Sequence, residues 1–334
     1  MKKLLIILTV LVLGSTLVFA GGSQETTKGS GVITLKLGSS QNDGTAELEA
    51  AKEFARLLEV YSGGTMKCDV LGNGLAGGER EIVESQQIGT LDMSVVSGIL
   101  QNFDPAMMIL EYDLLFVNED HVLKVFNGPV GQQIYNRLID SADIRILNMY
   151  LRTPRLMTTN KPINTTADLA GLKLRVPEMQ ARTALWKALG ASPTPMAFNE
   201  VYTALQTGTI DGQENPISTI NSSKFYEAVD YLAVTNHVYG FMFINITEDR
   251  WQSLTKQQQE WVARAAAESA VFNDKLAKEQ EKSLMDMVTK RMTVTYPDTS
   301  SWREKTKDVY KQFANVDGFL ELYTAIVDAG KEFE

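Results

Sequence analysis

Apolar and polar positions along this chain alternate between two periods, and the alternation predicts an α/β fold. Residues 32–38 (VITLKLG) and 67–71 (KCDVL) read as short strands. Between them, residues 45–61 place apolar side chains on one face at helical spacing, and a second helix follows the glycine-rich loop 72–78. This order of short apolar strands and helices is typical of a sheet covered by helices.

Two stretches repeat one pattern, and the repeat predicts the position of a binding cleft. Residues 81–92 (EIVESQQIGTLD) and 200–211 (EVYTALQTGTID) carry Glu, Gln, Gly, Thr and Asp at the same steps. Each copy predicts a helix that stops at a left-handed glycine and continues as a strand. Two copies indicate two lobes built alike, and ligands of open α/β sheets lie beyond the carboxyl ends of such strands. The alternative is a pair of unrelated helix–glycine–strand units.

The rest of the chain continues the mixture of strands and helices. Residues 121–139 read as a helix interrupted at a Gly-Pro pair, and residues 145–151 read as a strand. Residues 171–177 (GLKLRVP) read as a strand closed by proline, and residues 181–189 as the helix that follows it. Residues 302–334 read as a helical tail.

The longest helical pattern runs from residue 256 to about residue 290. Thr255 and Gln258 form a capping-box pair at its start. Such a helix spans about 50 Å, which exceeds one domain, so we expect it to bridge both lobes or to bend between them. The alternative is two helices with an unmarked break. The expected buried stripe consists of Trp261, Ala265, Phe272, Leu276 and Leu284.

The first residues of the chain differ from the rest. Lys2 and Lys3 precede an apolar run over residues 4–18, and a Val-Phe-Ala sequence ends at residue 20. This pattern predicts a secretory signal peptide over residues 1–20, since the apolar run is short for a membrane span. Residues 21–31 (GGSQETTKGSG) read as a flexible leader. The mature protein is therefore expected to be soluble and periplasmic.

Composition and charge disfavour or exclude several classes of function. The chain has 334 residues, enough for two domains, and its formal net charge of −9 disfavours nucleic acid and anionic membranes as partners. Its single cysteine, Cys68, excludes an intramolecular disulfide and a Cys/His zinc site. Its two histidines have no metal-binding spacing, and no Gly-x-Ser-x-Gly elbow occurs. We therefore expect a binding protein without a metal or cofactor, and not an enzyme.

Two polar features near the second copy of the repeat are candidates for ligand binding. Arg155 and Arg175 lie in strand-like surroundings, and a guanidinium can pair bidentately with a carboxylate. On spacing alone, solvated surface arginines remain the alternative. Residues 211–216 (DGQENP) follow the second predicted strand and suit a loop that presents hydrogen-bonding groups. An ordinary turn is the alternative for that segment.

Between Arg155 and His237 the chain resembles the solute-binding proteins of TRAP (tripartite ATP-independent periplasmic) transporters. The resemblance is carried by RLMTTNKPIN, DLAGLKLRVP, LGASPTPMAFNEVYTALQTGTIDGQENP and KFYEAVDYLAVTNHVY, and it extends over essentially the whole mature chain. It implies a periplasmic-binding-protein-like fold, in which two α/β lobes surround a central cleft and a long helix spans both. Lobe 1 is expected to comprise residues 32–152 and about 241–280, and lobe 2 residues 153–240 and about 281–334.

The resemblance also implies roles for residues of the second lobe. Arg175, in the L-R-V-P motif, resembles the arginine that forms a salt bridge with the ligand carboxylate. Arg155 and Asn215 resemble its supporting ligands, and Phe198 matches a pocket phenylalanine of the sialic-acid-binding members. Glu214, His237 and Gln213 match a network of polar residues behind the arginine. In this network a buried His237 would be hydrogen-bonded to Glu214, beside Gln213.

The first lobe departs from the sialic-acid pattern. Residues 94–99 read SVVSGI where those members carry acidic and arginine side chains. By the repeat, Ser94 corresponds to Gln213, so Ser94 and Ser97 are expected to face the cleft. Hydroxyl-rich and amide-rich walls suit a uronate, an aldonate or a related hydroxy acid, while a C4-dicarboxylate, a keto acid or sialic acid remain alternatives. Further candidate ligand-binding residues are Glu79, Arg80, Gln41, Asn42 and Tyr239.

The family implies a transport mechanism. The ligand carboxylate would pair with Arg175 in the open protein, lobe closure would bury the ligand, and the closed protein, expected to be a monomer, would deliver it to small and large integral membrane subunits. Two other classes stay open. One is a sensory binding protein, and the other is a periplasmic enzyme acting on a carboxylate, for which Glu214 and His237 are the available acid–base pair.

Overall fold

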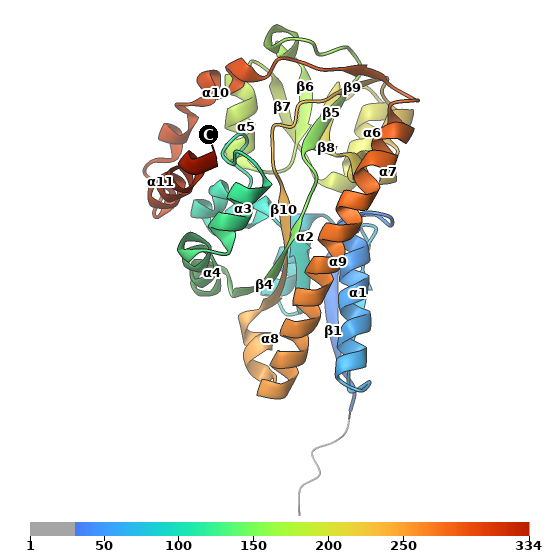
Figure 1. The fold of residues 1–334 in the computed structure, drawn as a ribbon, viewed down its shortest axis with the longest axis vertical. Coiled ribbons are helices and arrows are strands. Elements are labelled where there is room, and N and C mark those ends of the chain that lie inside the picture. The colour runs from blue at the N-terminus through green and yellow to red at the C-terminus, as the bar shows by residue number, and fades with distance from the viewer. Residues whose placement is uncertain (1–30, 334) are drawn as a thin grey trace, which may run out of the picture. The chain divides into compact units, whose positions relative to one another are not determined.

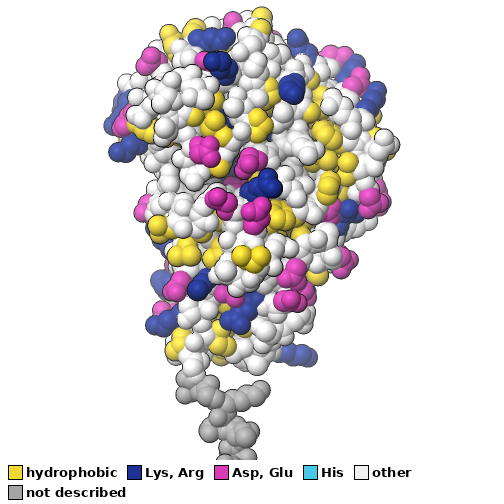
Figure 2. Space-filling view, turned by 180° about the vertical axis from the view of Figure 1, so that it is seen from behind, with side chains coloured by type: hydrophobic (Ala, Val, Ile, Leu, Met, Phe, Trp, Pro, Cys, Tyr) yellow, Lys and Arg dark blue, Asp and Glu magenta, His cyan; other side chains and the backbone are white. Residues whose placement is uncertain are grey.

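The computed structural model describes residues 31–333, so the predicted signal peptide and nearly all of the predicted leader lie outside the described residues. Val32–Glu334 form one compact unit (Figure 1). No helix within residues 31–333 combines the length and apolar character needed to cross a membrane. Charged side chains of both signs are interspersed over the face drawn in Figure 2.

The unit contains two sheets, which confirms the α/β prediction. The five-stranded sheet, sheet A, has the order β2-β1-β3-β10-β4, and β10 runs antiparallel to both of its neighbours. The six-stranded sheet, sheet B, has the order β11-β9-β5-β8-β6-β7. The strands of sheet A are β1 (Ile33–Ser39), β2 (Met66–Leu71), β3 (Met93–Val96), β4 (Ile144–Leu151) and β10 (Phe241–Thr247). Those of sheet B are β5 (Arg155–Thr159), β6 (Lys173–Val176), β7 (Ser192–Pro195), β8 (Gly212–Pro216), β9 (Tyr231–Ala233) and β11 (Thr293–Thr295).

Helices cover both faces of the sheets (Figure 1). The first helices are α1 (Ala46–Tyr61), α2 (Glu79–Gln87), α3 (Glu119–Phe126), α4 (Pro129–Ala142), α5 (Gln180–Ala188) and α6 (Val201–Gln206). The later ones are α7 (Ile217–Ser222), α8 (Glu248–Ser253), α9 (Lys256–Val288), α10 (Ser300–Thr306) and α11 (Phe319–Gly330). Short 3₁₀ helices are η1 (Gly98–Asn102), η2 (Pro105–Ile109), η3 (Thr166–Leu169), η4 (Phe198–Glu200), η5 (Phe225–Glu227), η6 (Val309–Phe313) and η7 (Lys331–Phe333).

The sequence repeat is a structural repeat. Helix α2 is followed by Gly89 at φ +74° and leads into β3, and α6 is followed by Gly208 at φ +68° and leads into β8. The aspartates that end the two copies make equivalent contacts. Asp92 accepts a hydrogen bond from the backbone N–H of Lys36 at 2.8 Å, and Asp211 accepts one from that of Lys173 at 2.9 Å. Each aspartate therefore ties its strand to the neighbouring parallel strand, β1 or β6.

The chain passes between the two sheets at three places. Residues 152–154 lead from β4 to β5, residues 234–240 lead from β9 to β10, and α9 leads from sheet A toward β11. Helix α9 is one uninterrupted helix of 33 residues with the predicted capping box at Thr255 and Gln258. It lies beside α1 at one end and α7 at the other (Figure 1), so it bridges the two halves as expected.

The predicted buried stripe of α9 is only partly correct. Ala265 is buried and Trp261, Leu276 and Leu284 are half-buried, but Phe272 is 38% exposed. Ser269 and Asn273, which were not predicted, are fully buried. The polar residues face sheet A because they bond to it. Ser269 Oγ lies 2.8 Å from the Tyr150 hydroxyl, and Asn273 Nδ2 donates to the carbonyl of Leu151 at 2.8 Å. The other buried positions of α9 are Val262, Ala266, Ala270 and Val288.

The C-terminal tail is not one helix but α10, η6 and α11. Trp302 of α10 packs against Trp186 in the core beside sheet B, with ring centroids 5.5 Å apart. Helix α11 packs on η2, α3 and α4, on the side of sheet A (Figure 1). The turn that separates them contains Gly318 at φ +76°. The tail thus contacts both halves of the molecule.

Candidate binding site

A cavity lies between the ends of the two sheets and is lined from both. It contains about 530 Å³ of space outside the protein atoms, its open mouth included. We call the residues from elements around sheet A the sheet-A wall, and those from elements around sheet B the sheet-B wall. The polar and aromatic residues of the sheet-A wall are Gln41, Glu79, Arg80, Ser97, Glu111 and Arg152. Those of the sheet-B wall are Arg155, Arg175, Glu178, Phe198 and Asn215.

Arg175 is a buried cation without a carboxylate partner. It lies on β6 with 3% of its surface exposed, and its Nε and Nη2 donate to the carbonyl of Met196 at 3.1 and 2.8 Å. Its guanidinium carbon lies 6.0 Å from the ring centre of Phe198. Burial lowers the pKa of Arg175 to about 10, against the attraction of Glu214, so it stays protonated at neutral pH. No carboxylate of the described residues forms an ion pair with it, and a buried cation without one favours binding an anion.

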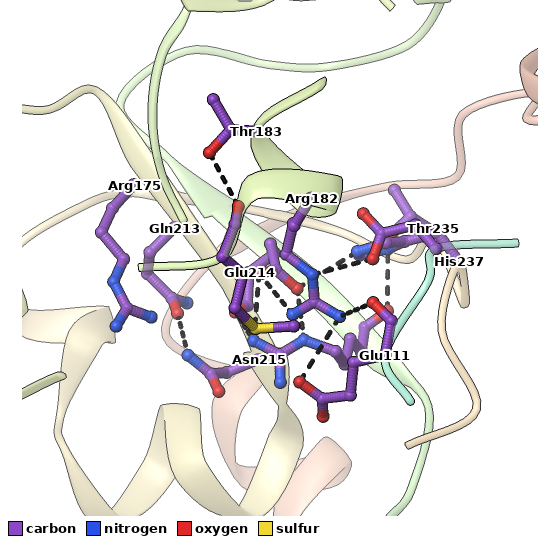
Figure 3. A network of polar contacts seen from close by, with 12 residues as sticks. Glu111, Arg175, Arg182, Thr183, Gln213, Glu214, Asn215, Thr235 and His237 are labelled. Carbon is purple, nitrogen blue, oxygen red and sulfur yellow. Dashed lines mark hydrogen bonds and ion pairs between the residues drawn. The ribbon is translucent and has the colours of Figure 1, made fainter. Parts of the chain in front are cut away.

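Arg155, by contrast, belongs to a closed network of ion pairs. It pairs with Glu214 through Nε and through Nη2, the latter at 3.0 Å from Oε1. Arg182, fully buried on α5, approaches the same carboxylate at 3.3 Å and Asp113 at 2.8 Å (Figure 3). Burial alone opposes ionisation of Glu214, but Arg155, Arg182 and His237 hold its pKa well below its usual range. The charge of Arg155 is thus already compensated within the protein.

The predicted contact between His237 and Glu214 is present. His237 Nε2 lies 3.2 Å from Glu214 Oε2, and its Nδ1 lies 2.8 Å from the Thr235 hydroxyl. The ring also packs edge-on against Trp186 with centroids 5.2 Å apart. His237 is buried by these contacts and does not line the cavity.

Successive polar side chains of strand β8 point to opposite sides of the strand. Gln213 and Asn215 share one side of the strand, and Glu214 points to the other, into the arginine network (Figure 3). Asn215 lines the cavity, and its Nδ2 donates to Gln213 Oε1 at 2.6 Å. Gln213 Nε2 in turn donates to the Thr158 hydroxyl at 2.8 Å. Gln213 therefore orients Asn215 from behind.

On the sheet-A wall, four predicted residues reach the cavity, namely Gln41, Glu79, Arg80 and Ser97. Glu79 is the first residue of α2 and accepts a hydrogen bond of 3.4 Å from Ser40. Burial raises the pKa of Glu79, and the nearby Glu111 carboxylate adds to the shift. Phe198, predicted on the opposite wall, also lines the cavity.

Three predicted residues do not reach it. Ser94 is fully buried inside sheet A, where its hydroxyl exchanges hydrogen bonds of 3.1 and 2.8 Å with Asn245 of β10. Gln213, its counterpart on β8, is likewise fully buried and bonds to Thr158 of the antiparallel neighbour β5, so the correspondence holds but places neither residue in the cavity. Asn42 instead donates to the Ser223 hydroxyl at 3.1 Å, and Tyr239 lines a separate cavity beside α9.

Sequence reasoning missed four charged residues of the site. Arg152, Glu111 and Glu178 line the cavity, and Arg182 holds the network behind it. A signal existed for three of them. Glu111 interrupts an otherwise apolar run, Arg152 precedes Arg155 where the chain crosses between sheets, and Arg182 lies within an apolar helix face. A charge in a buried pattern indicates a partner or a ligand.

Comparisons with known proteins agree with this geometry. The family model DctP, described as bacterial extracellular solute-binding protein, family 7, matches residues 37–317. The chain is 36% identical over 279 residues to a solute-binding protein of Roseobacter denitrificans, covering 83% of this chain and 85% of that protein. It is 33% identical over 282 residues to the sialic acid-binding periplasmic protein SiaP of Vibrio cholerae, covering 84% and 88%.

Solved structures of solute-binding proteins also match this chain. A TRAP periplasmic solute-binding protein of Roseobacter denitrificans with bound L-galactonate matches with a TM-score of 0.84 and 34% identity, covering 90% of this chain and 99% of that one. The sugar acid binding protein DctPAm of Advenella mimigardefordensis, in complex with galactonate, matches with a TM-score of 0.86 and 29% identity, covering 91% and 99%.

Proposed function

This chain belongs to family 7 of the bacterial extracellular solute-binding proteins and is a TRAP solute-binding protein, and on that premise we propose that it captures a sugar acid through Arg175. The observation that carries the proposal is the missing counter-ion. Arg80, Arg152 and Arg155 also line the cavity, and each has a carboxylate of its own in Glu84, Glu47 or Glu214. Arg175 has none among the described residues, so a ligand carboxylate would complete its pairing.

The rest of the sheet-B wall supports this role. Asn215, oriented by Gln213, offers an amide beside the arginines, and Phe198 packs against the Arg175 guanidinium. Arg155 is compensated by Glu214, so we assign it to positioning. The carbonyl of Met196 holds the Arg175 fork through Nε and Nη2 and leaves Nη1 for the ligand.

Capture is proposed to proceed by closure of two lobes. These lobes are residues 32–152 with about 241–280, and residues 153–240 with about 281–334, with α11 packed across to the first. The crossings at residues 152–154 and 234–240 would act as the hinge. Closure buries the ligand between the walls, and it is driven by higher affinity of the closed form for the ligand. The signal peptide would export the protein, and the closed form would deliver its ligand to the TRAP membrane subunits.

A sugar acid fits both walls better than a plain acid. Away from Arg175, the cavity presents Gln41, Glu79, Ser97 and Glu111. Their amide, carboxylate and hydroxyl oxygens can each accept a hydrogen bond from a ligand hydroxyl group. Similar proteins bind galactonate. An aldonate or a uronate is therefore the proposed ligand class.

A thermal-shift screen tests this proposal. The protein is unfolded and refolded to remove bound ligand, and then melted with aldonates, uronates, sialic acid, C4-dicarboxylates and keto acids. A ligand at 100 times its Kd adds about 2.7 kcal/mol to stability. We expect a raised melting temperature with an aldonate or uronate, and no shift with the matching neutral amide such as galactonamide. An equal shift with the amide, or a response confined to acids without hydroxyl groups, would contradict it.

A further inference from the structure

Two carboxylates of the sheet-A wall face the cavity without full partners. Glu79 has no ion pair among residues 31–333, and its recorded hydrogen bond is the 3.4 Å contact from Ser40. Glu111 has a side chain only 7% exposed, and its nearest cation, Arg182, lies 3.7 Å from its Oε2. These two carboxyl groups thus lack full partners on one wall, whereas the opposite wall presents the unpaired cation Arg175.

Glu111 is a surplus carboxylate in the arginine network. Arg182 already approaches Asp113 at 2.8 Å and Glu214 at 3.3 Å, so its single charge is shared before Glu111 is reached. A distance of 3.7 Å is also too long for a hydrogen bond. Within the described part of the chain, neither carboxylate oxygen of Glu111 accepts one. Buried carboxylates need donors, and the cavity is the side from which a donor can come.

Arg152 flanks the same point of the cavity wall. A Cβ placed on Gly240 would lie 3.8 Å from both Arg152 Cβ and Glu111 Oε1, so both side chains approach this glycine. The Arg152 charge is neutralised by Glu47, 2.5 Å from its Nε, and its Nη2 donates to Gln41 and Thr219 at 3.3 and 2.8 Å. Its Nη1 has no acceptor among the residues that the structure describes. Both side chains line the cavity.

We propose that Glu111 and Arg152 form a hydroxyl-reading pair that restricts this protein to monocarboxylates with a neutral, hydroxylated far end. A hydroxyl can donate to Glu111 and accept from Arg152 at once. A second carboxylate at that end would meet Glu111 and Glu79, while Arg152, already neutralised, would not compensate it. Like charges brought together in a binding site oppose binding and so create specificity. This inference rests on the proposed function, because it assumes that the first carboxylate lies on Arg175.

Isothermal titration calorimetry with two matched probes tests the pair. Galactonate carries one carboxylate, and galactarate has the same carbon chain with a second carboxylate in place of the far hydroxymethyl group. We expect the wild-type protein to bind galactonate at least about tenfold more tightly than galactarate. Glu111→Gln keeps the side-chain size and removes the charge, so it should reduce this preference about tenfold or more. Glu279→Gln, on the exposed face of α9, is the control that should leave it unchanged.

Arg152 is tested together with its counter-ion, so that no buried charge is left unpaired. The double variant Arg152→Gln/Glu47→Gln should weaken galactonate binding about tenfold, since a site built to bond a hydroxyl suffers when one partner is lost. Unchanged galactonate affinity would remove Arg152 from the pair.

Three further outcomes would overturn the inference. An unaltered galactonate-to-galactarate ratio in a Glu111→Gln protein with the wild-type melting temperature contradicts it while the proposed function stands. A wild-type protein that binds galactarate as tightly as galactonate contradicts it directly. If the wild-type protein binds no monocarboxylate at all, the proposed function fails, and the inference fails with it.

Discussion

The two copies of the helix–glycine–strand repeat have the same backbone and different chemistry. On β8, Asn215 supplies a binding amide and Glu214 the centre of an ion-pair network, while Gln213 bonds within the sheet to Thr158. At the corresponding end of β3, Ser94 bonds within its own sheet, and only Ser97 reaches the cavity. We infer that the repeat forms the backbone frame of the cleft, while the binding groups differ between the two copies.

Three polar groups of the sheet-A wall come from outside the repeat, whereas Glu79 and Arg80 lie on its helix α2. Gln41 follows β1, Glu111 follows η2, and Arg152 follows β4. These positions lie in loops, which can vary without disturbing the sheet. The sheet-B wall therefore supplies a fixed anchor for a carboxylate, and the sheet-A wall supplies the groups that distinguish one acid from another.

The largest expected contrast between the copies is in stability. Glu214→Gln leaves the buried Arg155 and Arg182 without their shared counter-ion, and should lower the free energy of unfolding by about 3–5 kcal/mol. Ser94→Ala in β3 removes neutral hydrogen bonds to Asn245 and should cost about 1 kcal/mol. Urea unfolding of the two variants measures both. Equal losses would mean that the network is no more important than the serine.

The pH dependence of stability should have opposite signs for Glu214 of the buried network and for Glu79 of the sheet-A wall. Glu214 has a folded-state pKa below its unfolded value near 4.5, so its stabilisation is present above that pH and is lost as the pH falls through the folded pKa. Glu79 has a raised pKa, so it contributes stability at low pH that is lost as the pH rises through that value. Unfolding free energies between pH 3 and pH 8 should lose one slope in Glu214→Gln and the opposite slope in Glu79→Gln. A common sign in both variants would refute the assignment.

The shared frame predicts a smaller and equal effect in the two copies. Gly89 and Gly208 both adopt positive φ, and an added Cβ meets no atom within 4 Å at either position. Alanine at either position should therefore cost about 1–2 kcal/mol through backbone strain alone. Thermal unfolding of Gly89→Ala and Gly208→Ala measures this. Markedly unequal losses would show that the two turns are not equivalent.

The smallest effects are expected at the predicted residues that lie outside the cavity. Tyr239→Phe keeps the ring beside α9 and removes a hydroxyl that does not line the site. Its galactonate affinity should stay within about twofold of the wild-type value, well inside the tenfold that 1.4 kcal/mol represents. Calorimetry is the check, with Ser97→Ala on the cavity wall as the contrasting variant. A tenfold loss in Tyr239→Phe would return this residue to the site.

The sequence predicted the frame of this molecule better than its walls. Glycine-terminated helices and short apolar strands are local patterns, so the repeat, α9 and its capping box could be placed in advance. The buried stripe of α9 could not, because Ser269 and Asn273 are buried only through partners on β4. Arg175 and Asn215 were identified through the family motifs. Glu111 and Arg152 were missed because their positions depend on where separate segments meet at Gly240.

The most direct test of the central assignment is the affinity of the Arg175→Ala and Arg175→Lys proteins for galactonate, measured by calorimetry. Loss of a buried charge partner should cost about 2–5 kcal/mol in Arg175→Ala, which is roughly thirtyfold to several thousandfold. Arg175→Lys should also bind weakly, since an ammonium does not reproduce the planar fork. Arg264→Ala, on the exposed face of α9, should bind as the wild-type protein does. Wild-type affinity in Arg175→Ala would contradict the role of Arg175 as the carboxylate anchor.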